Sequence, residues 1–597
     1  MRYRTQKVTR DVRRDGTILL QSGYPLAPVS DSTNEWLERW HAERPHSVFL
    51  AEREAEGWRH LTYGQALPQV QQLAAGLLAE GLGAETPILI LSGNGIDHGL
   101  LALAAQYVGI PFVPVAEQYS LIPGAQAQLQ YVLELIDPRM VYAVDGETFA
   151  SALALPQMAG RRRVVSRNAV GDMAELSRLM RAPGPEVAAA RTAVGPDTVA
   201  KILMTSGSTS NPKGVVTTQR MLCANQAQYV GALPFMDQRP PVLVDWLPWN
   251  HVFGGSNNFN QVLFHGGALY IDNGKPAPHL IGRSFENLKL VSPTIAYNVP
   301  VGFAQLRDRM QQDEELKQAY FCDLDMLFYA GASLPPDVWQ DLSRMAREVR
   351  GADVMLTTCW GMTETAPACI FQHEPSAAPG MVGAPLPGVT VKMVPDEGDR
   401  YEIRVKGPNI LPAYFKAPDK TAEAFDEEGF FLTGDAMTLA DADNPNRGLK
   451  FAGRIAEDFK LATGIWVRAT DLRLELLAAL KPLALDVVIT GDMRDEVGVL
   501  IFPAPATVPG LQDAAGFAVN VDLMEDIAER LRRFSDPGRG SANRIARAAI
   551  LTEPPSMAEG EVTAKGNLNF RKVQLRRQDL VRRLYEGSGH QGRITFE

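Results

Sequence analysis

The stretch Thr205-Ser206-Gly207-Ser208-Thr209-Ser210-Asn211-Pro212-Lys213-Gly214 directly follows the apolar run Ile202–Met204. Glycines in such a loop let the backbone turn N–H groups toward an anion, hydroxyl groups donate further hydrogen bonds, and a lysine adds a mobile positive charge. The loop is not of the Walker type, because Pro212 stands where that pattern requires its second glycine. A polar connection between two strands is the alternative, and the ordered Pro-Lys-Gly ending argues against it. The stretch therefore predicts a loop that binds the phosphates of ATP through Thr205, Ser206, Gly207, Ser208, Thr209 and Lys213.

The composition is that of a large, mildly acidic protein. Its 597 residues exceed what one hydrophobic core usually supports, so several domains are expected. The 59 Lys and Arg against 69 Asp and Glu argue against a general nucleic-acid binder. The four cysteines lack Cys-x-x-Cys spacing, which predicts neither a disulfide framework nor a zinc site. Since no apolar stretch is long enough for a membrane span or a secretory signal, we expect a cytoplasmic protein with neither nucleic-acid nor membrane partners.

Hydrophobic periodicity predicts an α/β fold. Residues 61–115 combine a helical repeat with the buried strand Ile88–Leu91. A second α/β part at about 200–370 contains strand-like runs at 242–244, 268–271, 326–329 and 354–356. Short β-like runs among many glycines and prolines indicate a small β subdomain at about 380–452.

The pattern changes again after about residue 455. Helices are predicted at 472–480 and 521–534, and strands at 485–489 and 497–502. We therefore expect a large N-terminal domain, residues 1–454, made of two α/β layered subdomains plus the β subdomain. A smaller, mobile α+β C-terminal domain is expected at 455–597.

Further motifs follow the loop in order: Tyr329-Ala330-Gly331-Ala332, Trp360-Gly361-Met362-Thr363-Glu364, Thr433-Gly434-Asp435 and Gly453-Arg454. In this order the chain resembles the acyl-adenylate-forming superfamily of acyl-CoA synthetases, nonribosomal peptide synthetase adenylation domains and luciferases. The resemblance implies that the Thr363 hydroxyl meets the α-phosphate and that Glu364 holds Mg²⁺. Attack of a carboxylate on phosphorus brings two anions together, so cations and oriented donors are required. The implied nucleotide site is completed by Gly331, Ala332, Trp360, Gly361, Asp435, Arg454 and Lys460.

Two positions depart from the superfamily pattern. The interdomain hinge falls on Ala456, where the superfamily usually has Asp or Lys. The catalytic lysine near the C-terminus usually follows a glycine, whereas here Thr563-Ala564-Lys565-Gly566 places it before one. We assign the catalytic role to Lys565, because a flexible ammonium reaches the same atoms after a small loop shift. The alternative is a surface role for Lys565, with another lysine such as Lys572 acting instead.

The run from Asp245 to Gly255 resembles the superfamily motif that borders the acyl pocket, and His251 within it is assigned a positioning role. By motif position, the predicted acyl pocket contains Trp249, His251, Phe253, Tyr297, Asn298, Val299 and Gly331. This run, the order around Lys565 and the alanine hinge together resemble feruloyl-CoA synthases most closely. The predicted activity is an ATP- and CoA-dependent, AMP-forming ligase for a hydroxycinnamate.

Other functions stay open from the sequence. Medium-chain fatty acids and benzoates are alternative substrates. An adenylation module that loads a carrier protein uses the same residues, although no carrier-like segment is visible in this chain. A non-enzymatic acyl-nucleotide sensor is the remaining alternative, and the oligomeric state is open.

Overall fold

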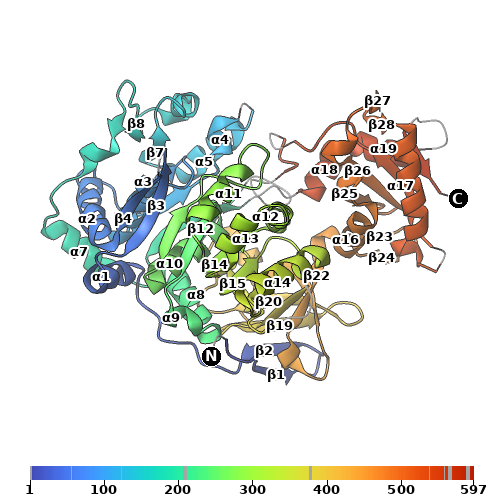
Figure 1. Cartoon of the computed structure of the whole chain (residues 1–597), viewed down its shortest axis with the longest axis horizontal. Coiled ribbons are helices and arrows are strands. Elements are labelled where there is room, and N and C mark those ends of the chain that lie inside the picture. Colours follow the sequence, from blue (N-terminus) through green and yellow to red (C-terminus); the bar gives the residue numbers. More distant parts are fainter. Residues whose placement is uncertain are drawn as a thin grey trace.

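The computed structural model describes residues 3–55, 57–122, 124–205, 212–375, 380–536, 538–556, 559–562, 568–586 and 592–596. The chain forms a large N-terminal lobe and a smaller C-terminal lobe, drawn in orange to red in Figure 1. This confirms the predicted α/β fold with a smaller C-terminal part. Of the predicted site residues, Ser206, Gly207, Ser208, Thr209 and Lys565 lie outside the described residues.

A seven-stranded sheet carries the hairpin on either side of the phosphate loop. Its order is β11-β10-β6-β5-β7-β8-β9, and every pair is parallel except β10 with β11. The strands are β5 (Ile88–Ile90), β6 (Phe112–Pro114), β7 (Met140–Asp145), β8 (Arg162–Arg167), β9 (Ala174–Glu175), β10 (Val199–Thr205) and β11 (Lys213–Thr218). The helices α2 (Tyr63–Ala79) and α3 (Ile96–Tyr107) contact each other and bury their apolar side chains in the main hydrophobic core. Strand β5 confirms the strand predicted at residues 88–91.

An eleven-stranded sheet joins parallel and antiparallel parts in the order β1-β2-β19-β20-β21-β22-β18-β17-β16-β15-β14. Its parallel strands are β14 (Ile295–Asn298), β15 (Met326–Tyr329) and β16 (Met355–Gly361). The antiparallel strands are β1 (Val8–Val12), β2 (Ile18–Ser22), β17 (Ala368–Phe371), β18 (Met381–Pro385), β19 (Thr390–Pro395), β20 (Arg400–Lys406), β21 (Phe431–Leu439) and β22 (Leu449–Arg454). The strands of the expected β subdomain are thus continuous with the parallel strands that carry the next motifs.

A four-stranded sheet has the order β12-β13-β3-β4, with β12 (Val242–Asp245), β13 (Ala268–Ile271), β3 (Val48–Glu54) and β4 (Gly57–Thr62). Between β12 and β13 the chain forms the π-helical turn η3 (Val252–Asn258) and the helix α10 (Phe259–His265). Helix α8 (Gln219–Ala232) contacts α10. These elements surround the motif that begins at Asp245.

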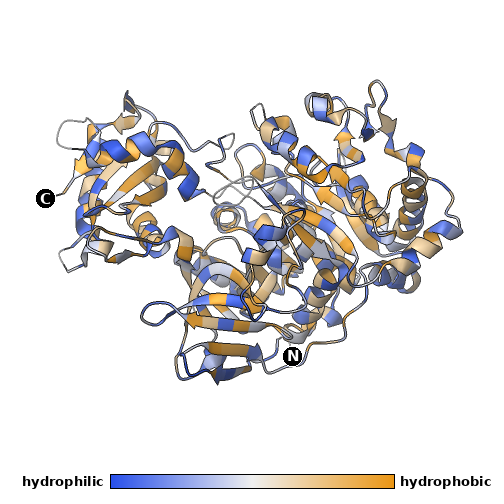
Figure 2. Cartoon of the chain, turned by 180° about the vertical axis from the view of Figure 1, so that it is seen from behind, coloured by the Kyte–Doolittle hydropathy of each residue, from blue (hydrophilic) through white to orange (hydrophobic). Residues whose placement is uncertain are grey.

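The C-terminal lobe has a hydrophobic core of its own. Its sheet is β25 (Ala484–Thr490), β26 (Val497–Pro503), β29 (Ile545–Ile550) and β30 (Arg593–Thr595), with the helices α16 (Ala469–Leu480), α17 (Val521–Phe534), α18 (Phe570–Arg576) and α19 (Gln578–Tyr585). Figure 2 shows hydrophobic residues along the strands of both lobes and many hydrophilic residues on the helices. In the described parts of the chain, no helix has both the length and the apolar character that a membrane crossing requires.

Candidate active site

The ends of the phosphate loop form an antiparallel pair. Thr205 at the end of β10 lies opposite Lys213 at the start of β11, and the Thr205 hydroxyl donates to the Lys213 carbonyl at 3.4 Å. The Lys213 ammonium lies 4.8 Å from the ring centroid of Tyr414, within the range of a cation–π interaction. The strand pair therefore holds the predicted phosphate-binding lysine beside a tyrosine.

Tyr414 connects this lysine to the second motif. Its hydroxyl donates to Glu364 Oε1 at 3.0 Å, and Glu364 lies in the 3₁₀ turn η4 (Thr363–Thr365) just after β16. Burial and the nearby Glu364 carboxylate raise the pKa of Tyr414 well above its usual value, so the hydroxyl keeps its proton. Sequence reasoning missed Tyr414, because its partners Lys213 and Glu364 are distant in the sequence.

The turn that follows β16 requires a glycine. A Cβ at Gly361 would lie 1.9 Å from the carbonyl oxygen of Pro367, a separation that no side chain tolerates. Thr363 lies two residues further along and is 7% exposed. The close approach of the backbone thereby fixes the direction of the segment that carries Thr363 and Glu364.

Asp435, which is predicted to bind the ribose, lies beside Trp360 and Arg454. The Trp360 indole N–H donates to Asp435 Oδ2 at 2.8 Å, and the Arg454 guanidinium lies 3.7 Å from Oδ1. Asp435 on β21 is paired in register with Arg454 on β22. Burial raises the pKa of Asp435 to about 6, although Arg454 and the Trp360 hydrogen bond act in the opposite direction.

Parallel pairing aligns the carboxyl ends of β14, β15 and β16. Asn298 lies opposite Tyr329, and Tyr329 lies opposite Thr358. Ligands in open α/β sheets collect at such ends. Gly331 follows β15 with φ 90°, and a Cβ there would be 3.9 Å from Val299 Cγ1. The structure thus brings Val299 and Gly331 together, while Ala332 is exposed next to them.

The predicted acyl-pocket residues separate into two groups. Phe253 on η3 packs against Tyr297 and Phe328, with ring centroids 5.8 and 5.7 Å away. His251 begins η3 and accepts a hydrogen bond from the Phe253 N–H at its Nδ1 atom, 3.2 Å away. This aromatic cluster lies beside the carboxyl ends of β14 and β15.

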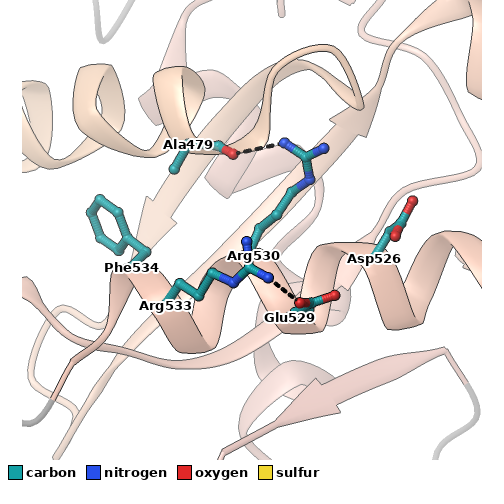
Figure 3. Close-up of a pocket in the computed structure, with 6 residues that line it drawn as sticks. All are labelled: Ala479, Asp526, Glu529, Arg530, Arg533 and Phe534. Atoms are coloured by element: carbon teal, nitrogen blue, oxygen red, sulfur yellow. Dashed lines mark hydrogen bonds and ion pairs between the residues drawn. The ribbon is translucent and has the colours of Figure 1, made fainter.

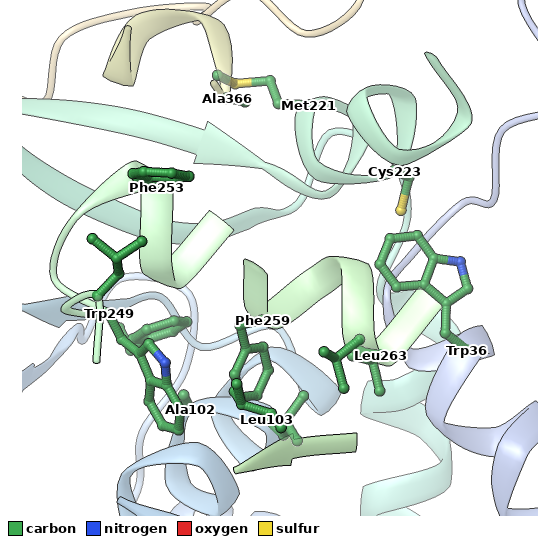
Figure 4. Packing of buried hydrophobic residues seen from close by; sticks show 14 of the residues in the cluster. Trp36, Ala102, Leu103, Met221, Cys223, Trp249, Phe253, Phe259, Leu263 and Ala366 are labelled. Carbon is green, nitrogen blue, oxygen red and sulfur yellow. The ribbon is translucent and has the colours of Figure 1, made fainter. Parts of the chain in front are cut away.

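Trp249 belongs to the second group. Its ring packs on His98 at 5.1 Å and on Phe259 at 4.9 Å, and Figure 4 shows it next to Ala102.

The side-chain oxygen of Asn298 accepts from the Trp246 indole at 3.2 Å and from the Val299 N–H at 2.9 Å. Asn298 therefore shapes the end of β14 through these contacts.

Lys201 is a buried charge that sequence reasoning did not single out. It is 2% exposed on β10, and its ammonium donates to the Gly255 carbonyl in η3 at 2.7 Å. Burial lowers its pKa to about 7. Together with His98, Gln106 and Asn260, the side chain lines a cavity of about 20 Å³. This cavity has room for about one water molecule.

The predicted hinge lies between the lobes. Ala456 is exposed in the 3₁₀ turn η6 (Ile455–Glu457), and Lys460 follows with its ammonium 4.9 Å from the Trp466 ring. Asp458 pairs with Arg400 of the large lobe at 2.7 Å and with Arg468 of the small lobe at 3.2 Å. The segment after the hinge is thus tied to both lobes.

A more spacious hollow of about 410 Å³ lies in the C-terminal lobe between α16 and α17 (Figure 3). It is lined by Ala479, Asp526, Glu529, Arg530, Arg533 and Phe534. Arg530 already donates to the carbonyls of Ala479 and Lys481, and Arg533 pairs with Glu529. Because its charged groups compensate one another and no motif residue lines it, this hollow is separate from the candidate active site.

The residues near Glu364 fit a magnesium ion. Mg²⁺ takes hard oxygen ligands and usually needs only one or two carboxylates in addition to phosphates and water. The Glu364 carboxylate and the Thr363 hydroxyl are of that kind. Across the described residues, no three His, Cys, Asp or Glu side chains gather as a metal cluster. A single carboxylate beside a hydroxyl suits an ion that also binds nucleotide phosphates.

The pattern that defines the AMP-binding enzyme family matches residues 37–415. The chain is 30% identical over 399 residues to the sulfoacetate–CoA ligase of Cupriavidus necator, covering 64% of this chain and 71% of that protein. It is 26% identical over 438 residues to human long-chain-fatty-acid–CoA ligase 6, covering 64% of this chain and 60% of that protein. The chain thus spans less than two thirds of the length of this human relative.

Among solved structures, an anthranilate CoA ligase in complex with anthranoyl-AMP is similar with a TM-score of 0.71. The similarity covers 93% of this chain and 99% of that chain at 18% sequence identity. At this identity the similarity establishes the fold, including the smaller C-terminal lobe.

Proposed function

Since the chain belongs to the family of AMP-binding enzymes, we propose that it is an ATP-dependent carboxylate–CoA ligase that releases AMP. The observation that carries the proposal is the contact chain from Lys213 through Tyr414 to Glu364. It joins a mobile cation to a carboxylate suited to Mg²⁺. The buried Asp435, with two acceptor oxygens for ribose hydroxyls, adds to this support.

In the first half-reaction, a carboxylate oxygen of the acid attacks the α-phosphorus of ATP. The bond from that phosphorus to the bridging oxygen breaks, and pyrophosphate leaves with the electron pair. Lys213 and the Thr363 hydroxyl would bind the phosphate oxygens, and Glu364 would hold Mg²⁺. When bound, the ion supplies charge neutralisation at the phosphates. Lys565 would bind the attacking carboxylate.

In the second half-reaction, the thiolate of CoA attacks the acyl carbon, and AMP leaves as the acyl-CoA forms. The acyl-AMP formed in the first half-reaction is a mixed anhydride. Its acyl carbon is already electrophilic, so no protein nucleophile is required. Rotation of the C-terminal lobe about Ala456 would remove Lys565 and open a path for the thiol. One pocket would then serve both half-reactions.

A hydroxycinnamate is the proposed acid, which makes the enzyme a feruloyl-CoA synthase. Support comes from the buried aromatic cluster of Phe253, Tyr297 and Phe328, whose rings are edge-on or tilted to one another, beside the predicted nucleotide site. Aromatic side chains bind a flat ring through offset or edge-on contacts. A fatty acid is the second candidate, because the human relative named above is a long-chain-fatty-acid ligase.

The decisive experiment measures AMP release from ATP and Mg²⁺ with CoA and a panel of hydroxycinnamates, benzoates and fatty acids. We expect ferulate or 4-hydroxycinnamate to give the highest kcat/KM. AMP release that requires an added carrier protein would instead identify a loading module. Nucleotide binding without AMP release from any acid would identify a sensor and would refute the proposal.

Lys565→Ala separates the two half-reactions. We expect acid-dependent pyrophosphate exchange to collapse, while transfer from preformed feruloyl-AMP to CoA persists. The matched variant Lys572→Ala should leave both steps nearly unchanged. Equal loss of both half-reactions in Lys565→Ala would refute the role assigned to this lysine.

A further inference from the structure

Several buried polar atoms near the aromatic cluster lack partners. Gln226 on α8 is 0% exposed, and within the described chain neither its amide oxygen nor its amide nitrogen has a hydrogen-bond partner. The same holds, over the same residues, for Ser256 Oγ on η3. The Tyr229 hydroxyl on α8 has only the Cys359 thiol beside it, which is a weak hydrogen-bond partner. Buried polar groups are nearly always paired, so an unpaired set requires an explanation such as water or a ligand.

Two of these groups, Gln226 and Tyr229, lie on one face of α8, whereas Ser256 lies on η3. Leu222, Gln226 and Tyr229 share that face, because positions i, i+4 and i+7 align on a helix. Leu222 lines the small cavity together with Gly255 of η3. Along this face of the helix, Gln226 therefore stands between Leu222, which lines the cavity, and Tyr229.

Tyr229 reaches the aromatic cluster. Its ring packs on Phe371 at 5.5 Å, Phe371 stacks on Phe328 at 5.7 Å, and Phe328 packs on Tyr297 at 5.1 Å. Ser256 follows Phe253 on the same turn of η3. Tyr229 and Ser256 thus connect α8 and η3 to the aromatic residues of the proposed acyl pocket, and Gln226 is one helical turn from Tyr229.

We propose that Gln226 and Ser256, with the Tyr229 hydroxyl, hydrogen-bond a hydroxyl or ether oxygen on the ring of the acid. This inference rests on the proposed ligase function and names the group that selects its substrate. A glutamine amide both donates and accepts, as does a hydroxyl, so the set matches a phenol. An alkyl chain would leave Gln226 and Ser256 unpaired, and sites built to bind a hydroxyl reject analogues that lack it.

The test compares 4-hydroxycinnamate with cinnamate, which differ only in the ring hydroxyl. We expect the wild type to prefer 4-hydroxycinnamate by at least about 100-fold in kcat/KM. Gln226→Leu, which has nearly the same volume, should reduce this preference at least about tenfold with an unchanged KM for ATP. Ser256→Ala should reduce it in the same direction.

Gln228 on the same helix is the matched control, because it is buried but paired. Its side chain donates to Asn409 at 3.0 Å and accepts from Asn225 at 3.0 Å. Gln228→Leu should lower the Tm and keep the ring preference in the folded protein. Gln226→Leu should keep or raise the Tm, because it removes unpaired polar atoms from the core.

Two outcomes overturn the inference while leaving the ligase function intact. One is equal use of cinnamate and 4-hydroxycinnamate by the wild type, which would mean that the polar atoms bind only water. The other is an unchanged preference in both Gln226→Leu and Ser256→Ala. Failure of every acid to yield AMP would instead refute the ligase function itself.

Discussion

Asp435 combines burial with a proposed role, ribose binding, that needs its charge. Its pKa is raised from 3.8 to about 6 by burial, so ionisation costs the folded state free energy. Wild-type stability should therefore fall as the pH rises from about 4 to about 6, by up to about 3 kcal/mol, and then stay level. Asp435→Asn keeps an acceptor for Trp360 and should abolish this slope, which thermal unfolding from pH 4 to pH 8 measures.

The same ionisation should control nucleotide binding. Only the carboxylate accepts hydrogen bonds from both ribose hydroxyls through two charged oxygens. The wild-type KM for ATP should therefore increase as the pH falls below about 6, while Asp435→Asn shows a higher, pH-independent KM. A variant that retains the wild-type pH profile would contradict this role for Asp435.

Tyr414 makes two interactions, a hydrogen bond to Glu364 and a ring contact with Lys213, and two substitutions can remove them separately. Tyr414→Phe removes the hydroxyl that donates to Glu364 but keeps the ring beside Lys213. A hydrogen bond to a charged group contributes about 1.5–3 kcal/mol, so we expect at least a roughly tenfold loss in kcat/KM for Mg·ATP. Tyr414→Leu removes both contacts and should lose more. Steady-state kinetics at varied Mg²⁺ measure both variants, and equal activities of Tyr414→Phe and wild type would be the contrary result.

The secondary structure could be predicted from local patterns. The apolar runs at 88–91, 242–244, 268–271 and 326–329 all became strands, because buried parallel strands are apolar on both faces. Their arrangement could not be predicted. The run at 242–244 joins a sheet with β3 and β4, and β1 with β2 extends the sheet of β19, through pairings between distant segments that local periodicity does not encode.

The site was predictable to the extent that a motif carried it. Trp360, Asp435 and Arg454 meet as their motifs imply. Tyr414, Lys201 and Gln226 were not foreseen, because each acquires its importance from burial or from a partner far along the chain. The residues next to each of them in the sequence indicate neither this burial nor these partners.

The buried Lys201 on strand β10 should lower the free energy of unfolding by an amount that can be measured. Burial lowers the pKa of Lys201 from 10.5 to about 7, so the folded state loses its proton before the unfolded chain does. Wild-type stability should then rise between pH 7 and about pH 10. Lys201→Met should be more stable than the wild type by at least about 1 kcal/mol at pH 7, and this difference should shrink toward pH 10.

Lys392 on β19 is the matched control, because it is also buried but pairs with Asp426 at 2.8 Å. Its pKa is raised by hydrogen bonds to Asp426 and Glu428 despite burial. Lys392→Met should destabilise the fold by about 1–3 kcal/mol, since it removes a charged hydrogen-bond partner from the buried Asp426, which then pairs only with Arg404. Denaturant unfolding of both variants at pH 7 should give opposite signs, and destabilisation in both would mean that Lys201 stabilises the strand.

The two lobes are joined by a charged network around the hinge. Asp458, with its side chain 2% exposed, pairs with Arg400 of the large lobe, whose side chain is 6% exposed. Arg468 of the small lobe reaches both Asp458 and Glu397 of the large lobe, at 3.2 and 2.9 Å. Rotation about Ala456 would have to break these contacts, so they favour the orientation described here. At the proposed hinge, these ion pairs would supply the anchoring that a polar hinge residue otherwise provides.

Asp458→Asn should therefore shift the balance between orientations. Removing one partner of a buried pair costs about 3–5 kcal/mol, far more than an exposed pair contributes. We expect one half-reaction, pyrophosphate exchange or acyl transfer from preformed acyl-AMP, to slow about tenfold or more while the other is maintained or accelerated. Lys481→Ala is the control, because its pair with Asp337 also crosses the lobes but is exposed on both sides and should change neither rate. Equal slowing of both half-reactions by Asp458→Asn would mean that the network supports the fold of the hinge and not the choice of orientation.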